Sequence, residues 1–392
     1  MPRSHDSLKA VGLFSGIGGF ELGFASAGIE TKLVCEIDKQ ASAVLRANLS
    51  EADYHNDICT LNALPEADAL SAGFPCQNLS LVGSNAGIKG EQSRLINEVF
   101  RLIAPVNPRL RWVVLENVPF MLWHRKGEAI RYVTQCLEEL GYRWAYRVID
   151  TRAFGLPQRR RRVIIVASRS EDPCSVLFAE DAGPREFNDD GEVACGFSWT
   201  EGRLGLGWAV DCVPTLKAGS AVGVPSPPAI WLRGEKLIVT PHICDAERLQ
   251  GFDANWTNVE VDGKLPKRGV RWRMVGNAIP VTLSQWVGQN IANPRSLPHQ
   301  IAAQQWDGAV WPNAAFNSKG KVYRVAISEW PVRQQYVGLE EFLMHDTTPL
   351  SARASAGFLN RTRQSKLRFA PGFIQAVEMH VENMENSTKV AA

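Results

Sequence analysis

The sequence predicts an α/β fold in which helices cover a mostly parallel sheet. Short apolar runs such as Ala10–Phe14 and Ala69–Phe74 have the length of buried strands. Helical patterns, such as the one over Glu128–Leu140, separate several of these runs. This alternation of strands and helices is typical of a parallel sheet with helical crossovers.

The elements behind this prediction lie in the first 168 residues. A glycine cluster ends the first apolar run and opens a helix. In chain order we expect elements at Ala10–Phe14 (strand), Ile17–Ala27 (helix), Lys32–Asp38 (strand), Ala69–Phe74 (strand), Asn97–Ile103 (helix), Trp112–Leu115 (strand), Glu128–Leu140 (helix) and Val163–Ala167 (strand).

The rest of the chain divides into three parts. Residues 169–240 are for the most part rich in Gly, Pro, Asp and Glu, and we expect a small separate domain there. Residues 241–293 are expected to return to the first domain, because an apolar helical face recurs over 283–291. Residues 294–392 hold three tryptophans, so we expect them to fold as a third unit.

Composition excludes several classes of protein. The chain has 392 residues, of which 45% are hydrophobic and 21% charged, as in globular proteins. The net charge of +2 gives no bulk signal for nucleic acid. None of the eight cysteines stands at CxxC spacing, so we expect no metal site or disulfide framework and a reducing, cytoplasmic setting. An apolar signal segment and a membrane span are both missing from the sequence.

A glycine loop with an acidic partner predicts a nucleoside-bearing cofactor. Phe14–Phe20 reads FSGIGGF, follows a strand and opens a helix, whose first N–H groups are free to bind a ligand. Glu36 ends the next strand, where an acid commonly binds a ribose. Asp57 follows a third possible strand and is a candidate for the adenine amine or a solvated loop residue. The alternatives for the glycines are a plain tight strand-to-helix turn and the loop of a dehydrogenase.

A cysteine follows another predicted strand. Pro75 and Cys76 come directly after Ala69–Phe74, at the sheet edge where open α/β folds bind ligands. Residues 77–94 are polar and contain glycines, which suits a mobile lid. A single cysteine is more often a small buried hydrophobe. The strand-end position and the proline favour a nucleophile here.

An acid and a run of arginines complete the candidate site. Glu116 lies at the end of a buried strand, where it could share a pocket with Cys76 and hold or donate a proton. Four arginines precede Val163–Ala167. Alternation along a strand places Arg160 and Arg162 on one face, toward the site, and leaves the other two for phosphates or acids. A solvated patch is the alternative for the arginines, and pairing with a base is the alternative for Glu116.

Together these motifs resemble the DNA (cytosine-5) methyltransferase family of the prokaryotic restriction–modification type. The resemblance runs in order along most of residues 8–291. The matching segments are Phe14–Gly19 (cofactor loop), Glu36 (ribose acid), Asp57 (adenine aspartate), Pro75–Gln77 (catalytic loop), Glu116–Val118 (ENV), Gln158–Arg162 (QxRxR), Pro214–Leu216 (Thr-Leu), Glu247–Phe252 and Gly276–Val281 (last motif).

The resemblance implies a fold, a cofactor and a set of site residues. The fold is a Rossmann-like S-adenosylmethionine-dependent core in residues 1–168 and 241–293, with a target-recognition domain in 169–240 and an extension of unknown role in 294–392. The last helix is expected to pack against the first motif. The implied residues are catalytic Pro75, Cys76, Glu116, Asn117, Arg160 and Arg162; cofactor-binding Phe14, Ser15, Gly16, Ile17, Gly18, Gly19, Glu36, Ile37, Asp57, Ile58, Asn277 and Ala278; and substrate-binding Gln77, Ser80, Arg94, Gln158, Thr215 and Leu216.

The implied reaction is methyl transfer to carbon 5 of a flipped-out cytosine in a specific double-stranded DNA sequence. Cys76 adds to the base, Glu116 acts at the ring nitrogen, Arg162 with Arg160 holds the carbonyl, and Asn117 orients the cysteine loop. The enzyme would act as a monomer on DNA, with a cognate restriction endonuclease as a possible partner. Alternatives are the same chemistry on a tRNA cytosine, a catalytically silent DNA-binding relative, and a nicotinamide dehydrogenase.

The recognition region departs from what DNA binding favours. Residues 169–217 hold ten acidic and four basic side chains, and we expect these acids to face solvent. Basic residues cluster elsewhere, at Lys264, Lys267, Arg268, Arg271 and Arg273, and at Arg353, Arg361, Arg363, Lys366 and Arg368. The extension is therefore expected either to grip the DNA backbone or to serve as a packing or dimerising appendage.

Overall fold

The computed structural model describes residues 7–75, 91–203, 205–219, 226–297 and 302–390. Contacts divide the chain into two compact units. Unit 1 comprises Met1–Phe154, Arg161–Pro184 and Ala278–Gln334, and unit 2 comprises Gly155–Arg160, Arg185–Asn277 and Gln335–Ala392. No helix in the described part of the chain is long and apolar enough to cross a membrane.

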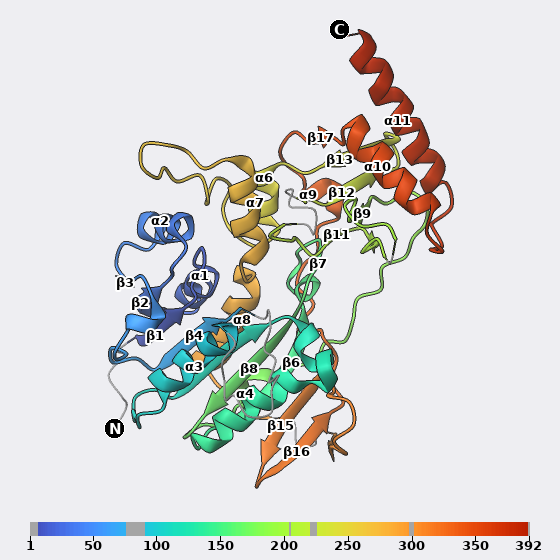
Figure 1. Cartoon of the computed structure of the whole chain (residues 1–392). Helices are drawn as coiled ribbons and strands as arrows, with labels where there is room; N and C mark the ends of the chain where they lie inside the picture. The colour runs from blue at the N-terminus through green and yellow to red at the C-terminus, as the bar shows by residue number, and fades with distance from the viewer. Residues whose placement is uncertain (1–6, 76–90, 204, 220–225, 298–301, 391–392) are drawn as a thin grey trace. The chain divides into compact units, whose positions relative to one another are not determined.

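Unit 1 is built on one large mixed sheet (Figure 1). Its ten strands lie in the order β14-β16-β15-β6-β8-β5-β4-β1-β2-β3. Their bounds are β1 Leu8–Leu13, β2 Ile29–Cys35, β3 Asp53–His55, β4 Ala69–Gly73, β5 Trp112–Asn117, β6 Arg143–Asp150, β8 Arg161–Ser168, β14 Ala303–Gln305, β15 Ala314–Ser318 and β16 Lys321–Val325.

The α/β class is confirmed, but the prediction of a mostly parallel sheet is wrong. Strands β3, β2, β1, β4 and β5 are parallel to their neighbours in that order. Strand β8 then pairs antiparallel with β5, with Asn117 opposite Val163. All further pairings, out to β14, are antiparallel as well. Only a 3-10 turn and the two-residue strand β7 separate β6 from β8, and a connection without a crossover helix favours antiparallel pairing.

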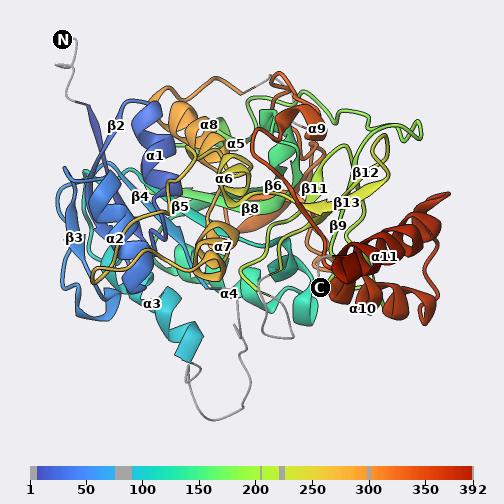
Figure 2. The same cartoon turned by 90° about the horizontal axis from the view of Figure 1, so that it is seen from above.

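Helices cover both faces of this sheet. Figure 2 shows α1 and α8 on one face and α3 and α4 on the other. The helices of unit 1 are α1 Gly19–Ser26, α2 Lys39–Asn48, α3 Glu91–Ile103, α4 Glu128–Glu139, α5 Cys174–Leu177 and α8 Val281–Ala292, with short 3-10 turns at Ile58–Thr60, Pro119–Leu122, His124–Lys126 and Thr151–Phe154. The core between α3, α4 and the sheet is continuous and apolar.

Unit 2 contains a second, smaller sheet. Its strands lie in the order β10-β9-β12-β13-β17, and a separate pair joins β7 to β11. Their bounds are β7 Gln158–Arg159, β9 Cys195–Phe197, β10 Ala209–Val210, β11 Val213–Pro214, β12 Ala229–Leu232, β13 Leu237–Thr240 and β17 Thr348–Pro349. The helices are α6 Ile243–Arg248, α7 Arg268–Asn277, α9 Leu339–Phe342, α10 Ala352–Arg363 and α11 Phe373–Val390.

Residues 294–392 do not form the single third unit that we expected. Strands β14, β15 and β16 extend the large sheet of unit 1, with Ala314–Phe316 paired to β6. Strand β17 instead pairs with β13 in unit 2, where α10 and α11 pack side by side (Figure 1). Phe358 and Phe373 from these helices share one apolar core with Phe197 and Trp231 of the small sheet. Without α10 and α11, one apolar face of the small sheet would be open to solvent. Burial of this face explains why the last part of the chain belongs to unit 2.

This shared core makes a stability prediction. Phe373 is fully buried, and its ring lies 5.0 Å from that of Phe197 and 4.9 Å from that of Trp208. We expect Phe373→Ala to lower the free energy of unfolding of unit 2 by about 3–5 kcal/mol. Chemical denaturation followed by tryptophan fluorescence measures it. Met379→Ala on the same helix, at a side chain that is 43% exposed, should change stability by less than about 1 kcal/mol. If both substitutions lowered the free energy of unfolding by the same small amount, α11 would not be part of the core of unit 2.

Candidate active site

The predicted glycine loop joins β1 to α1 in unit 1. Gly18 is the residue before the helix and has a φ of 90°, a conformation that favours glycine. A Cβ atom at Gly19 would lie 2.3 Å from the carbonyl oxygen of Ile279, just before α8. Because Gly19 has no side chain, α8 can pack closely against the glycine loop and α1. The expected packing of this helix against the first motif is confirmed. The return of the whole segment 241–293 is not, because the chain rejoins unit 1 only at Ala278 and residues 241–277 belong to unit 2.

Glu36 links the glycine loop to the end of β2. Its carboxylate accepts one hydrogen bond from the Gly16 N–H at 2.8 Å and another from the Asp38 N–H at 2.7 Å. Burial raises the pKa of this carboxyl, while the two N–H donors oppose the rise. Next to it, Ile37 is 66% exposed, an unusual position for a large apolar side chain. An apolar surface beside an acid is the combination that an adenosine requires.

Asp57 stands after β3, at the same edge of the sheet. Its carboxylate accepts a hydrogen bond from the Cys59 N–H at 2.9 Å and caps the short turn Ile58–Thr60. Ile58 is buried, and the side chain of Phe14 is partly buried against the core of unit 1. The parallel strands β1, β2 and β3 therefore bring Phe14, Glu36 and Asp57 to one edge.

The loop that follows β4 begins on a hydrogen bond from the next strand. The Asn117 side-chain amide donates to the carbonyl of Phe74 at 3.1 Å, and the Asn117 oxygen accepts from the Val118 N–H at 2.8 Å. Asn117 is buried and Pro75 is exposed. Cys76, Gln77 and Ser80 lie outside the described residues, as does the side chain of Arg94.

Glu116 and Arg162 form an ion pair in unit 1. The Arg162 Nε lies 2.6 Å from a Glu116 carboxylate oxygen, and the two side chains are 8% and 13% exposed. The antiparallel register explains the contact, because Glu116 pairs with Ile164 and the start of β8 meets the end of β5. Gly73 lies on the other side, since a Cβ there would be 3.4 Å from the second Glu116 oxygen. A cation and an acid thus meet beside the strand that leads to Cys76.

Arg160 and its neighbours have different partners from those predicted. Arg160 is 1% exposed and donates to the carbonyls of Leu216 and Gly276, within unit 2. Gln158 is fully buried, donates to the Leu249 carbonyl and accepts from the Leu216 N–H at 3.0 Å. These contacts differ from the predicted ones to a base, because the backbone leaves its sheet ladder between β7 and β8 and turns Arg160 inward.

Four further predicted residues serve the same internal network or lie beside it in the sequence. The Thr215 hydroxyl donates to the Arg159 carbonyl at 2.9 Å, and Leu216 is 1% exposed. Asn277 is exposed at the end of α7 in unit 2, and Ala278 is buried at the start of the next part of unit 1.

The arginines outside the predicted inner face pair with acids or with carbonyls. Arg161 pairs with Glu329 in unit 1, which agrees with the expected acid partner. Arg271, predicted as a DNA contact, is instead buried and paired with Glu247 at 2.9 Å. Arg361 donates to the carbonyls of Glu201 and Trp199 and holds α10 on unit 2. The internal contacts of Arg271 and Arg361 reduce the charge available to DNA at both predicted clusters.

Sequence reasoning missed Glu21, an acid in the first turn of α1. It is 2% exposed although it lies in a helix made otherwise of apolar and small residues. The signal was present in the sequence, because a lone acid within GFELGFAS falls on a buried face. Charged side chains are almost never fully buried without a partner.

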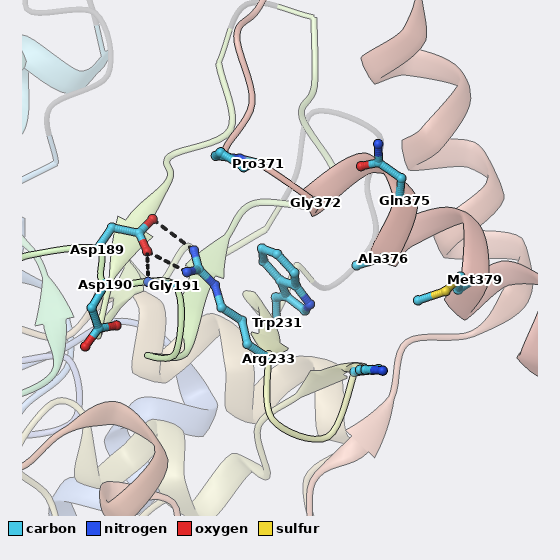
Figure 3. Close-up of a pocket in the computed structure, with 11 residues that line it drawn as sticks. Asp189, Asp190, Gly191, Trp231, Arg233, Pro371, Gly372, Gln375, Ala376 and Met379 are labelled. Atoms are coloured by element: carbon cyan, nitrogen blue, oxygen red, sulfur yellow. Dashed lines mark hydrogen bonds and ion pairs between the residues drawn. The ribbon is translucent and has the colours of Figure 1, made fainter.

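A cavity of about 670 Å³ lies in unit 2 (Figure 3). Arg233 lies over the Trp231 ring and binds Asp189 through both carboxylate oxygens at its wall. Gln375 and Met379 of α11 line the opposite side. None of the predicted site residues in the described part of the chain lines this cavity.

Comparison with known proteins identifies the family. The model of the C-5 cytosine-specific DNA methylases matches residues 8–191. The chain is 44% identical over 384 residues to the Type II methyltransferase M2.BsuMI of Bacillus subtilis (strain 168), covering 95% of this chain and 97% of that protein. The chain belongs to the C-5 cytosine-specific DNA methylase family. It is therefore a C-5 cytosine DNA methyltransferase.

Other relatives agree with this placement of the methylase. The Type II methyltransferase M.DsaV of Dactylococcopsis salina is 34% identical over 325 residues, which cover 75% of this chain and 88% of that protein. Among solved structures, the S. pombe Dnmt2 methyltransferase has a TM-score of 0.52 at 18% identity and covers 73% of this chain and 99% of its own. That likeness concerns the fold.

S-adenosylmethionine is the cofactor of the methylase, and the residues present fit it. The open glycine turn leaves room for close approach at the start of α1. The Glu36 carboxylate and the exposed Ile37 side chain suit a ribose and an adenine. No group of three or more His, Cys, Asp or Glu side chains among the described residues could hold a metal ion.

Proposed function

We propose that the methylase acts on a flipped-out cytosine in a specific double-stranded DNA sequence, through a covalent adduct with Cys76. The observation that carries this proposal is the largely buried Glu116–Arg162 pair at the end of β5. Asn117, the next residue, binds the carbonyl of Phe74 two residues before Cys76. These contacts support a rigid frame for a reactive loop.

The proposed roles follow from the chemistry of the base. Carbon 5 of cytosine is a poor nucleophile until a thiolate adds to carbon 6. Glu116 holds or donates a proton at the ring nitrogen, and Arg162 donates to the carbonyl oxygen and stabilises the negative charge left by attack. S-adenosylmethionine supplies the methyl group. Loss of the carbon 5 proton then lets the bond to Cys76 break.

Cofactor binding is proposed for residues at one edge of the sheet in unit 1. The glycine loop residues Ser15–Gly19 hold the amino-acid part, Glu36 the ribose, and Asp57 the adenine amine, with Phe14, Ile37 and Ile58 as apolar contacts. Asn277 and Ala278 remain proposed as cofactor contacts from the last motif, and Gln77, Ser80 and Arg94 as substrate contacts. Arg160, Gln158, Thr215 and Leu216 act on the substrate indirectly, because their contacts shape unit 2.

The finer biological setting is also a proposal. A Type II relative at 44% identity supports a restriction–modification role, with a cognate endonuclease as partner. We further propose that the enzyme acts in the cytoplasm, as a monomer on DNA. Lys264, Lys267 and Arg268 are exposed at the start of α7 or just before it, and they are our proposed phosphate contacts.

A DNA duplex carrying 5-fluorocytosine tests the covalent step. Fluorine replaces the proton that must leave, so the wild-type enzyme with S-adenosylmethionine should accumulate a stable protein–DNA adduct. Cys76→Ser should form none and should lose methyl transfer by at least about 10³-fold. Denaturing electrophoresis measures the adduct.

The controls separate the target and the nucleophile. Cys59→Ser changes a cysteine outside the proposed chemistry and should retain adduct formation. A tRNA substrate tests the alternative target, and bisulfite sequencing of DNA from expressing cells reveals the methylated sequence. An adduct that persists in Cys76→Ser would refute the assignment of the nucleophile.

A further inference from the structure

The space beneath the cofactor loop contains a carboxyl that the proposed mechanism does not use. Glu21 points from the first turn of α1 toward β1, where a Cβ at Gly12 would lie 1.8 Å from one of its oxygens. The same Cβ would lie 2.7 Å from the hydroxyl of Ser15, which belongs to the glycine loop. Only a glycine at position 12 leaves room for the two side chains, so β1, the loop and α1 enclose both.

Neither side chain has a satisfied polar group. Both Glu21 carboxylate oxygens and the Ser15 hydroxyl are buried without a hydrogen bond of normal geometry to any described residue. Burying a carboxylate without partners is costly, and proteins avoid it or use it at functional sites. Glu36, the other acid near the loop, differs because backbone N–H groups satisfy both of its oxygens.

Few charges act on Glu21 from the surrounding elements. Burial raises the pKa of its carboxyl to about 7, the Ser15 hydroxyl beside it lowers the pKa, and the Glu36 charge at the end of β2 raises it. Helix α8, which packs on α1, contains no ionisable side chain. Lys9 of β1 lies on the strand face opposite to that of Gly12 by alternation.

We propose that Glu21 is a positioning residue for S-adenosylmethionine: acting through Ser15, its carboxyl sets the glycine loop and ionises when the cationic cofactor binds. S-adenosylmethionine carries one net positive charge, from its sulfonium, ammonium and carboxylate groups. A positive charge near a poorly solvated acid favours the ionised form. The leaving proton goes to solvent, so cofactor binding and proton release are linked.

The sign of the pH dependence follows from this linkage. In the free enzyme the carboxyl is mostly neutral below pH 7, and in the complex its pKa is lower. Affinity is therefore greatest above pH 7 and falls as the pH decreases, by up to about tenfold per unit. The product S-adenosylhomocysteine lacks the sulfonium charge, so its affinity should fall less steeply.

Titration calorimetry with the cofactor alone tests the proposal on the full chain. Wild-type binding of S-adenosylmethionine between pH 6 and 7 should release a fraction of a proton that approaches one at the lower pH, measured in buffers of different ionisation enthalpy. Glu21→Gln should abolish this release, flatten the pH dependence and weaken binding at pH 8 by about tenfold. Because DNA is absent, the result does not depend on the chemistry proposed for Cys76.

Two further variants keep the test sharp if Glu21→Gln does not fold. Ser15→Ala removes a group that lowers the pKa of Glu21, so the loss of affinity should begin at a higher pH. Glu21→Asp should retain part of the proton release. Glu51→Gln, at an exposed acid of unit 1, is the matched control and should behave as wild type. Wild-type proton release in Glu21→Gln, or a shift to lower pH in Ser15→Ala, would overturn the proposal.

Discussion

Replacement of Glu116 by glutamine is expected to lower the rate constant of methyl transfer by about 10²–10⁴-fold. Glutamine retains the shape of the side chain and one oxygen for Arg162, but it has no ionisable proton to offer the ring nitrogen. The substitution also removes the negative charge of Glu116, whose carboxylate oxygen lies 2.6 Å from the Arg162 Nε. Single-turnover methylation of a DNA duplex with saturating cofactor measures the chemical step.

The affinity for S-adenosylmethionine should remain within about threefold of wild type in this variant, because Glu116 acts on the base. A matched control is Glu128→Gln, which alters an acid that lies 4.0 Å from Arg125 and is more exposed. That control should retain the wild-type rate within about twofold. Glu116→Gln with an unchanged rate, in a protein of unchanged melting temperature, would contradict the role of this pair.

The arginine on the other side of the pair offers a second readout. Arg162→Lys preserves the charge but loses the planar fork that can donate to Glu116 and to a carbonyl oxygen at once. We expect a rate loss of about 10²–10³-fold, comparable to the loss of one oxyanion donor. If both variants act on the same step, the double variant should lose much less than the product of the two factors.

Local patterns predicted the site in unit 1, whereas distant contacts determined what was missed. The apolar runs placed Phe14, Glu36 and Glu116 correctly at strand ends, since a short run bounded by polar residues leaves little choice. The direction of β8 could not be derived from its own residues. That direction nevertheless brings Arg162 beside Glu116, because a parallel β8 would begin at the opposite edge of the sheet.

Alternation along a strand failed at Arg160 for a related reason. The rule requires a continuous strand, but β7 ends at Arg159 and β8 begins at Arg161. The break lets the Arg160 guanidinium bind carbonyls from two segments of unit 2, more than 50 residues away in sequence. Pairing of the C-terminal elements with β6 and β13 likewise depends on which sheet edges are open.

The stability of unit 2 should depend strongly on a second ion pair, between Glu247 and Arg271. Glu247 has no exposed surface and accepts hydrogen bonds from the N–H groups of Asn255 and Thr257, at 2.7 and 2.9 Å. Arg271 of α7 completes the cluster at 2.9 Å. We expect Glu247→Ala to lower the free energy of unfolding by about 3–5 kcal/mol, because it leaves a buried arginine without its counter-charge. Urea denaturation of the full chain, followed by hydrogen exchange of the amides of α7, measures the loss and locates it.

Matched variants separate stability from DNA binding at this cluster. Arg271→Met should destabilise unit 2, and Glu247→Leu combined with Arg271→Met should recover at least about half of the loss, because an apolar pair of similar volume requires no desolvation of charge. Arg268→Ala, at an exposed residue on the same helix, should leave stability within about 0.5 kcal/mol but reduce the salt dependence of DNA affinity. If Arg271→Met instead weakened DNA binding with no loss of stability, Arg271 would be a phosphate contact and its pairing with Glu247 incidental.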